Sequence, residues 1–199
     1  MKAIKLKVNT NLESYQIIIG SNLIKNLNQH LKKNKITFNQ CLLVIDNNVP
    51  NKMISKITSS LKKKKVSKFV FKANEKNKNI KFINKILQIL LNKNFSRQDC
   101  IISIGGGITG DVAGFAASLY KRGLSFINVP TTLLSQVDSS LGGKTGINTK
   151  EGKNLIGSFY QPKLVISESE FLRTLSKREL ICGYGEILKH SLIMNKKFF

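Results

Sequence analysis

The 199-residue sequence predicts an α/β fold, in which a parallel sheet is flanked by helices and followed by the start of an all-helical domain. Two observations lead to this prediction. Apolar runs such as 41–45 and 100–104 alternate with segments of helical periodicity, which is typical of parallel strands buried on both faces. From about residue 168 the pattern is helical throughout. We therefore expect an α/β domain over residues 1–165 and the incomplete start of a helical domain over residues 166–199.

The elements are expected in a regular order along the chain. Two strands come first, over residues 2–8 and 14–19, because apolar and polar residues alternate there. A helix over residues 22–33 follows, with leucines four apart and Ser21 as a candidate N-cap. The remaining strands are expected at 41–45, 66–71, 100–104 and 124–129, and the remaining helices at 50–62, 78–93, 111–120, 168–175 and 176–194.

The net charge of +22 does not by itself indicate a nucleic-acid partner. Nearly all of the excess is lysine, with only four arginines, and it accompanies abundant asparagine and isoleucine, as a base-skewed genome produces. Basic residues are not interleaved with aromatic ones in the way that stacks bases. We therefore expect a small-molecule ligand and no nucleic acid.

The N-terminal sequence and the cysteines predict a cytoplasmic location. No apolar run approaches the roughly 18 residues that a membrane span needs, and residues 2–8 lack the apolar block of a signal peptide. The three cysteines have no metal-ligand spacing and are expected to be reduced. We therefore expect no membrane partner.

A glycine-rich segment follows the apolar run 100–104. Gly105, Gly107 and Gly110 match the spacing G-x-G-x-x-G between a strand and a helix, where backbone N–H groups can approach a pyrophosphate. A simple tight turn is the alternative interpretation. The acid that usually ends the next strand is absent, since that strand ends at Pro130, although an earlier strand ends at Asp46. The segment is therefore not a standard Rossmann unit.

A second polar segment begins directly after the strand that ends at Pro130. Thr131 and Thr132 stand where a ligand of a parallel sheet would lie, and Asp138 follows six residues later. Helix capping by either threonine is the alternative interpretation.

The next segment is rich in glycine and lysine. Lys144 lies in a Gly-Lys-Thr triplet, but the upstream glycine of a phosphate loop is replaced by Val137. We interpret Lys144, Lys153 and Asn154 as groups that face an anionic ligand, because lysine is a compact charge suited to phosphate and carboxylate.

The last segment lies on the expected final helix. Glu186, Lys189 and His190 are three and four residues apart and so share one face. This pattern fits either a surface ion pair or a carboxylate metal ligand beside a cationic substrate group. Zinc sites require three protein ligands, so the pattern leaves both interpretations open.

These four segments, in this order, resemble the 3-dehydroquinate synthase family of the sugar-phosphate cyclase superfamily. The resemblance runs from Asp99 to Met194, and its most specific stretches are GGGITGDVAGFAAS, YKRG, VPTTLLSQVDSSLGGKTGIN and GKNLIGSFYQP. The family's adenosine-side motifs correspond to residues 46–48 and 73–78, although Ala73-Asn74 replaces the usual Asp-Gly. The resemblance implies a Rossmann-like domain and a lyase that makes 3-dehydroquinate and phosphate from 3-deoxy-D-arabino-heptulosonate 7-phosphate in the shikimate pathway.

The resemblance also implies ligands for individual residues. NAD would contact Asp46, Asn48, Glu75, Lys78, Gly105, Gly106, Gly107, Ile108, Thr109, Gly110, Asp111, Thr131, Thr132, Lys144, Lys153, Phe171, Leu172, Arg173 and Thr174. The substrate would be held by Asp138, Lys144, Lys153, Asn154 and Lys189, and Arg122 would reach the phosphate site of a neighbouring subunit, which implies a homodimer.

Glu186 would be the metal ligand of this family, for zinc or cobalt. The other two ligands would be histidines of the helical domain, and His190 is not one of them. Because the sequence stops inside an expected helix at residues 195–199, we expect a truncated copy or fragment of a synthase. The alternatives are a related sugar-phosphate cyclase, a polyol dehydrogenase of the same superfamily, or a non-catalytic basic nucleotide-binding fragment.

Overall fold

The structure, a computed structural model, describes residues 3–10 and 13–194 and is built around one seven-stranded sheet. The order across the sheet is β1-β2-β9-β6-β5-β3-β4, and every neighbouring pair is parallel except β1 and β2. The predicted parallel sheet is therefore confirmed. The strands are β1 (Ile4–Asn9), β2 (Ser14–Gly20), β3 (Gln40–Asp46), β4 (Lys65–Phe71), β5 (Cys100–Gly105), β6 (Ser125–Pro130) and β9 (Leu164–Glu168).

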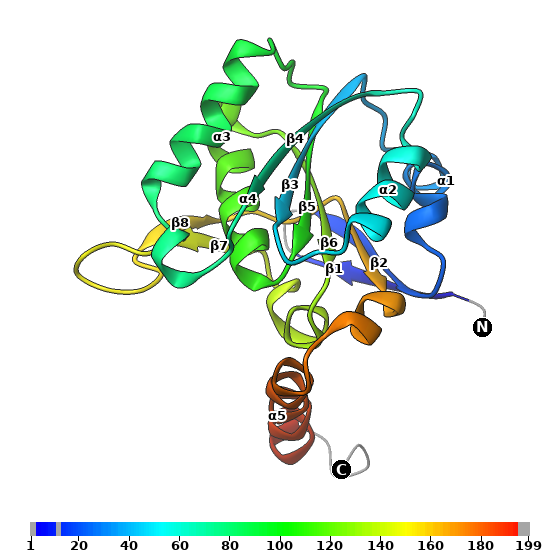
Figure 1. Cartoon of the computed structure of the whole chain (residues 1–199), viewed down its shortest axis with the longest axis vertical. Helices are drawn as coiled ribbons and strands as arrows, with labels where there is room; N and C mark the ends of the chain where they lie inside the picture. The colour runs from blue at the N-terminus through cyan, green and yellow to red at the C-terminus, as the bar shows by residue number, and fades with distance from the viewer. Residues whose placement is uncertain (1–2, 11–12, 195–199) are drawn as a thin grey trace.

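Helices cover both faces of the sheet (Figure 1). Side chains of β3 alternate between the two faces: Leu43 and Ile45 belong to one buried cluster, and Leu42 and Val44 belong to the other. The first cluster includes residues of α1 and α2, and the second includes residues of α3 and α4. The helices are α1 (Leu27–Lys33), α2 (Asn51–Ser60), α3 (Ile80–Asn92), α4 (Gly107–Leu119) and α5 (Lys177–Met194).

Three strands of the structure were not predicted. Strand β9 joins the sheet between β2 and β6 and runs across the expected domain boundary at residues 165 and 166. A separate antiparallel hairpin is formed by β7 (Lys144–Ile147) and β8 (Ile156–Phe159). The two strands approach closely because Gly146 faces Gly157. A Cβ added at Gly157 would lie 2.0 Å from the backbone oxygen of Thr145.

Several predicted boundaries require correction. Ser21 is not the N-cap of the first helix; the N–H groups of Leu23 and Ile24 instead donate to Glu168 Oε2, at 2.7 and 3.3 Å. That helix starts with a 3-10 turn at Ile24–Asn26, and α4 starts at Gly107, before the predicted residue 111. The first expected helix after residue 168 is a 3-10 helix (Ser169–Thr174). The predictions that concern residues 2, 11 and 195–199 lie outside the described residues.

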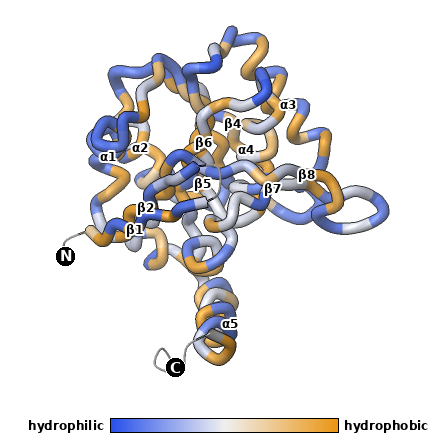
Figure 2. The backbone as a smooth tube through the Cα atoms, turned by 180° about the vertical axis from the view of Figure 1, so that it is seen from behind, coloured by the Kyte–Doolittle hydropathy of each residue, from blue (hydrophilic) through white to orange (hydrophobic). Residues whose placement is uncertain are grey.

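The carboxyl ends of the parallel strands meet at one edge of the sheet and place the candidate site there. Asp46, Gly105, Pro130 and Glu168 end β3, β5, β6 and β9 at this edge. Helix α5 extends away from the sheet at the same edge and carries apolar residues along its length (Figure 2). Among the described residues, no helix has the length and apolar character to cross a membrane.

Candidate active site

The glycine loop between β5 and α4 presents uncapped backbone N–H groups. The N-cap of α4 is Gly106, which has no side chain, and the N–H of Gly110 donates to the carbonyl of Gly106 at 3.1 Å. A Cβ at Gly105 would lie 2.3 Å from Thr109 Oγ1, so this turn requires glycine. The first turn of α4 therefore has the open N–H groups and the positive dipole end that favour an anion. Thr109 Oγ1 is buried without a partner among the described residues.

The two threonines lie beside the glycine loop, at the start of the next connection. The N–H of Thr131 donates to the carbonyl of Gly105 at 2.9 Å. Thr132 Oγ1 accepts from the N–H of Ser135 at 3.1 Å, so the capping interpretation is confirmed for Thr132. The methyl group of Thr132 packs against the glycine loop, since a Cβ added at Gly106 would lie 3.3 Å from it. Thr132 therefore caps the short helix that follows it and also contacts the glycine loop, where a ligand would bind.

A cavity of about 720 Å³ opens between α4, the hairpin and α5. Four of the residues predicted to bind ligands line it: Asp111, Asp138, Lys144 and Asn154. The rest of the lining is Val137, Ser139, Leu141, Gly142, Thr145, Gly146, Leu155, Gly157, Ser158, Phe159 and His190. Its size is that of a typical small-molecule site, and its polar groups carry both signs of charge.

Lys78 connects this cavity to the turn that precedes α3. Its side chain is only 6% exposed, forms an ion pair with Asp111 and donates to Asn154 Oδ1. Burial raises the pKa of Asp111, and the Lys78 ammonium opposes that rise. Lys78 is therefore held by one residue of α4 and by one residue of the lysine-rich loop.

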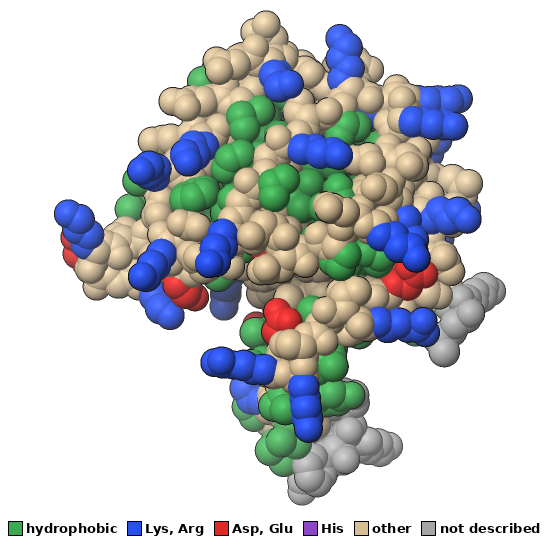
Figure 3. Space-filling model, in the orientation of Figure 1, with side chains coloured by type: hydrophobic (Ala, Val, Ile, Leu, Met, Phe, Trp, Pro, Cys, Tyr) green, Lys and Arg blue, Asp and Glu red, His purple; other side chains and the backbone are tan. Residues whose placement is uncertain are grey.

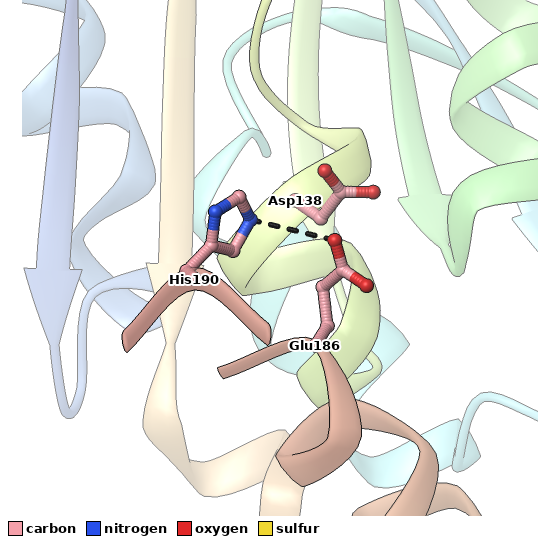
Figure 4. A group of neighbouring side chains, drawn as sticks. All are labelled: Asp138, Glu186 and His190. Atoms are coloured by element: carbon pink, nitrogen blue, oxygen red, sulfur yellow. Dashed lines mark ion pairs between the residues drawn. The ribbon is translucent and has the colours of Figure 1, made fainter. Parts of the chain in front are cut away.

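Asp138 forms a cluster with Glu186 and His190 on one face of α5 (Figure 4). One ligand atom from each lies within 4.8 Å of the other two, and His190 Nε2 is 3.4 Å from Glu186 Oε1. Lys189 also pairs with Glu186, so the predicted surface ion pair is present, and this contact raises the pKa of Lys189. Two carboxylates and an imidazole fit a divalent transition metal, which would have to displace Lys189 from the shared oxygen.

Close packing of α5 explains how Asp138 reaches Glu186. Asp138 lies in a single π-helical turn (Ser135–Ser139), whose short helix packs against α5 at Gly183. A Cβ at Gly183 would lie 2.5 Å from Leu133 Cγ, whereas one at Gly185 would meet nothing within 4 Å. The sequence placed Glu186 and His190 on one face but did not place Asp138 beside them, because the two segments are far apart in the chain.

Other predicted cofactor residues lie along the same edge of the sheet. Asp46 Oδ1 accepts from the N–H of Asn48 at 3.1 Å, and burial raises the pKa of Asp46. Glu75 lies in an exposed 3-10 turn (Glu75–Asn77). The side chain of Phe171 is fully buried in the core, and Leu172, Arg173 and Thr174 follow it in the 3-10 helix that comes after β9.

Arg122 is not brought to the cavity. It lies between α4 and β6, at the opposite edge of the sheet, with a backbone φ of 63°. Lys153 and Lys189 are exposed and do not line the cavity, but each contacts a predicted site residue. The Nζ atom of Lys153 is 3.7 Å from Glu75 Oε1. Lys189 pairs with Glu186.

A family model described as 3-dehydroquinate synthase N-terminal matches residues 68–182, which is more than half of the chain. The chain belongs to the 3-dehydroquinate synthase family. A 3-dehydroquinate synthase from Pelagibacter ubique (strain HTCC1062) is 67% identical over 199 residues, covering 100% of this chain and 54% of the relative. The chain therefore spans about half the length of the curated relatives that it matches.

Solved structures of related enzymes agree with this assignment. A 2-deoxy-scyllo-inosose synthase complexed with carbaglucose-6-phosphate, NAD+ and Co2+ has a TM-score of 0.90 at 26% identity, covering 96% of this chain and 52% of that chain. A 2-epi-5-epi-valiolone synthase from Streptomyces hygroscopicus subsp. jinggangensis 5008, with NAD+ and Zn2+ bound, has a TM-score of 0.82 at 28% identity, with the same coverage of 96% and 52%.

The 3-dehydroquinate synthase family match includes the glycine loop and the cavity residues Asp138, Lys144 and Asn154, and it ends before Glu186. One polar residue inside this range received no role in the sequence analysis. Asn148 hydrogen-bonds to Glu75 and to Asn154. The only sequence signal was its place at the end of the glycine-lysine segment.

Proposed function

We propose that this chain provides the dinucleotide- and substrate-binding part of a 3-dehydroquinate synthase, a lyase of the shikimate pathway that leads to chorismate and the aromatic amino acids. The reaction converts 3-deoxy-D-arabino-heptulosonate 7-phosphate into 3-dehydroquinate and inorganic phosphate. The observation that carries the proposal is that Asp111, from the glycine-loop helix, lines one cavity together with Asp138, Lys144 and Asn154. A nucleotide at α4 would thus lie beside an anionic sugar.

The residues of the glycine loop fit NAD as the cofactor. The open first turn of α4 suits the pyrophosphate, and the orphan hydroxyl of Thr109 offers a further polar group. Asp46 and Asn48, at the end of β3, suit ribose hydroxyls, and Glu75, Lys78, Thr131 and Thr132 complete the binding edge. Bound NAD would supply a hydride acceptor that is restored in each turnover. The two cyclase structures described above, which hold NAD+, support this part of the proposal.

The lysine segments would hold the anionic groups of the substrate. Lys144 and Asn154 line the cavity, while Lys153 and Lys189 contact Glu75 and Glu186 beside it. Fixed positive charges orient a phosphate and a carboxylate and stabilise negative charge that develops as phosphate departs. Asp138, which also lines the cavity, would accept hydrogen bonds from sugar hydroxyls.

Glu186 is the proposed metal ligand, with Asp138 and His190 as the adjacent donors of this chain. A bound divalent cation would polarise a substrate oxygen as a Lewis acid. Titration with Co2+ tests this assignment, because cobalt gives a visible absorption spectrum that changes with its ligands. We expect Glu186→Gln to abolish the signal and Lys189→Met to strengthen binding, since the competing ammonium group is removed. An unchanged signal in Glu186→Gln would place the cation elsewhere.

The arrangement of the whole protein is part of the same proposal. We propose that α5 opens a second, helical unit that begins after β9, because Ile181, Tyr184, Leu188 and Leu192 form an exposed apolar stripe along it, and Figure 3 shows apolar side chains on this helix. We also propose a cytoplasmic homodimer in which Arg122 serves the neighbouring subunit. In a dimer of full-length chains, mixing Arg122→Ala with Lys144→Ala protomers would then restore one intact site.

A chimera provides the decisive test of function. It continues this chain with the part of the Pelagibacter ubique relative that lies outside the match. We expect phosphate release from the heptulosonate phosphate that requires NAD+ and a divalent cation, and a large loss of turnover in Lys144→Gln. Release from sedoheptulose 7-phosphate or glucose 6-phosphate instead would indicate a sister cyclase. Absence of NAD+ binding by calorimetry, with salt-sensitive RNA binding, would favour the basic fragment.

A further inference from the structure

Asn148 lies at the end of β7, and both atoms of its side-chain amide are engaged. Its Nδ2 donates to Glu75 Oε2 at 2.7 Å and to the Glu75 carbonyl at 3.2 Å. Its Oδ1 accepts from the backbone N–H of Asn154 at 3.0 Å. Its own backbone N–H donates to the carbonyl of Lys78 at 2.8 Å. One residue therefore connects the turn before α3 with the loop that ends at Asn154.

The neighbours determine the orientation of this amide. The Asn154 N–H can only donate, so it must face the oxygen, and the carboxylate and carbonyl of Glu75 can only accept, so they must face the nitrogen. An aspartate at position 148 would still accept from the Asn154 N–H, but it would place a second negative charge against the Glu75 carboxylate. An alanine would lose both contacts.

The loop over residues 149–154 depends on this connection for its shape. It closes with a hydrogen bond from the Thr149 N–H to the Gly152 carbonyl at 2.9 Å, and Asn154 has a left-handed backbone with a φ of 58°. A second connection, between Lys153 and Glu75, is 3.7 Å long with both side chains more than half exposed, so it contributes little. The buried side chain of Lys78 also reaches this loop, at the side-chain oxygen of Asn154. Asn148 is therefore a stronger tether than the pair of Lys153 and Glu75, and it is the side chain that holds the backbone N–H of Asn154.

We propose that Asn148 is a positioning residue that couples the two halves of the site. It acts through Glu75 and Lys78, which are assigned to the dinucleotide, and through the loop that carries Lys153 and Asn154, which are assigned to the anionic substrate. Occupation of the dinucleotide side then fixes the loop in the geometry that holds a phosphate group. This inference rests on the proposed function, and it assigns to Asn148 no direct contact with either ligand.

Three variants separate the steps of this argument. Asn148→Ala removes both amide contacts, Asn148→Asp keeps the contact to Asn154 but breaks the contact to Glu75, and Asn92→Ala on the exposed end of α3 is the matched control. The first measurement is amide hydrogen exchange at Asn154 in the 199-residue chain. We expect exchange to become about tenfold faster in Asn148→Ala, as loss of one hydrogen bond predicts, and to stay unchanged in the other two variants.

The second measurement is the affinity of the chimera for inorganic phosphate, with and without saturating NAD+. We expect NAD+ to raise the phosphate affinity of the unmodified chimera, and we expect both Asn148 variants to lose that gain while keeping the affinity without NAD+ within about twofold. A purely structural role would lower both affinities together. If NAD+ binds and both Asn148 variants retain the gain, the inference is overturned and the proposed function stands.

If the unmodified chimera binds no NAD+, the proposed function fails, and the coupling inference fails with it. The exchange rate of the Asn154 amide still decides in that case whether Asn148 holds the loop. Equal protection of this amide in Asn148→Ala and in the unmodified chain would overturn the tether itself.

Discussion

Replacement of Lys78 with methionine tests whether the buried ion pair is a structural element of the site. Lys78 and Asp111 have side chains that are only 6% and 22% exposed. Methionine keeps most of the volume of the stem but removes the charge, which leaves the Asp111 carboxylate buried without its cation. Removal of one partner from a buried pair costs about 3–5 kcal/mol. Because Asp111 retains some contact with water, we expect a loss near 3 kcal/mol.

The assay is chemical and thermal unfolding followed by circular dichroism. For a chain of this length, a loss of 3 kcal/mol corresponds to a fall in Tm of about 6–12 °C. Lys76→Met, in the same turn but exposed, is the matched control and should change the free energy of unfolding by less than about 0.5 kcal/mol. The double variant Lys78→Met/Asp111→Asn should recover about 2 kcal/mol of the loss, because no unpaired charge remains.

The pH dependence gives an independent check. Burial raises the folded-state pKa of Asp111 above its value in the unfolded chain, and removal of the Lys78 ammonium raises it further. For an acid with a raised folded pKa, the ionised form destabilises the fold, and this penalty disappears as the pH falls through the folded pKa. The gap between Lys78→Met and the unmodified protein should therefore narrow in acid. A loss as small as that of Lys76→Met, or a gap that does not change with pH, would refute the reasoning.

Three further predictions concern glycines and one carboxylate. Gly183→Ala should push α5 off Leu133 and weaken Co2+ binding at least tenfold, whereas Gly185→Ala, where an added Cβ meets nothing within 4 Å, should leave Co2+ titration unchanged. Gly142→Ala and Gly143→Ala should each cost about 1–2 kcal/mol by denaturant unfolding, because both residues have a left-handed backbone. The end of the Gln161 side chain, which would lie 2.5 Å from a Cβ at Gly143, can move aside. Asp46→Asn should raise Tm at neutral pH but not in acid, because burial raises the pKa of Asp46 and so makes its ionised form unfavourable; equal gains at both pH values would contradict this.

Much of the sheet could be predicted from the sequence because its central strands carry long local signals. Strands β3 and β5 are continuous apolar runs that are buried on both faces, and the expected bounds agree within one or two residues. Strand β9 has only Leu164, Val165 and Ile166 as a local signal, and its partners β2 and β6 come from distant parts of the chain. The hairpin of β7 and β8 was not predicted, because glycines and lysines stand where an ordinary strand pair has alternating apolar residues.

The candidate site divides in the same way. The glycine loop and the shared face of Glu186 and His190 follow from local spacing, so the sequence was sufficient to predict them. The meeting of Asp138 with Glu186 depends on the approach of Gly183 to Leu133, which no local pattern reveals. The buried position of Lys78 likewise depends on Asp111 and Asn154, which are both distant in the sequence.

The scarcity of acids makes each carboxylate informative in this basic chain. With 33 basic residues against 11 acidic ones, an acid has many cations nearby but needs a specific reason to be placed where it is. Within the described residues, nine of these eleven acids form an ion pair or a hydrogen bond through the side-chain carboxylate. They are Glu13, Asp46, Glu75, Asp99, Asp111, Glu168, Glu170, Glu179 and Glu186.

Lysines, by contrast, are scattered over the face that Figure 3 shows, with no single basic stripe. The positive surface charge therefore follows from the high lysine content of the sequence, whereas the acidic residues lie at turns, at helix caps and in the candidate site. Glu168 illustrates this: one carboxylate ends β9, caps the first helix through Leu23 and Ile24, and accepts from the N–H of Glu170. Asp138 is one of the two acids outside those nine; it lines the cavity and lies within reach of Glu186 and His190.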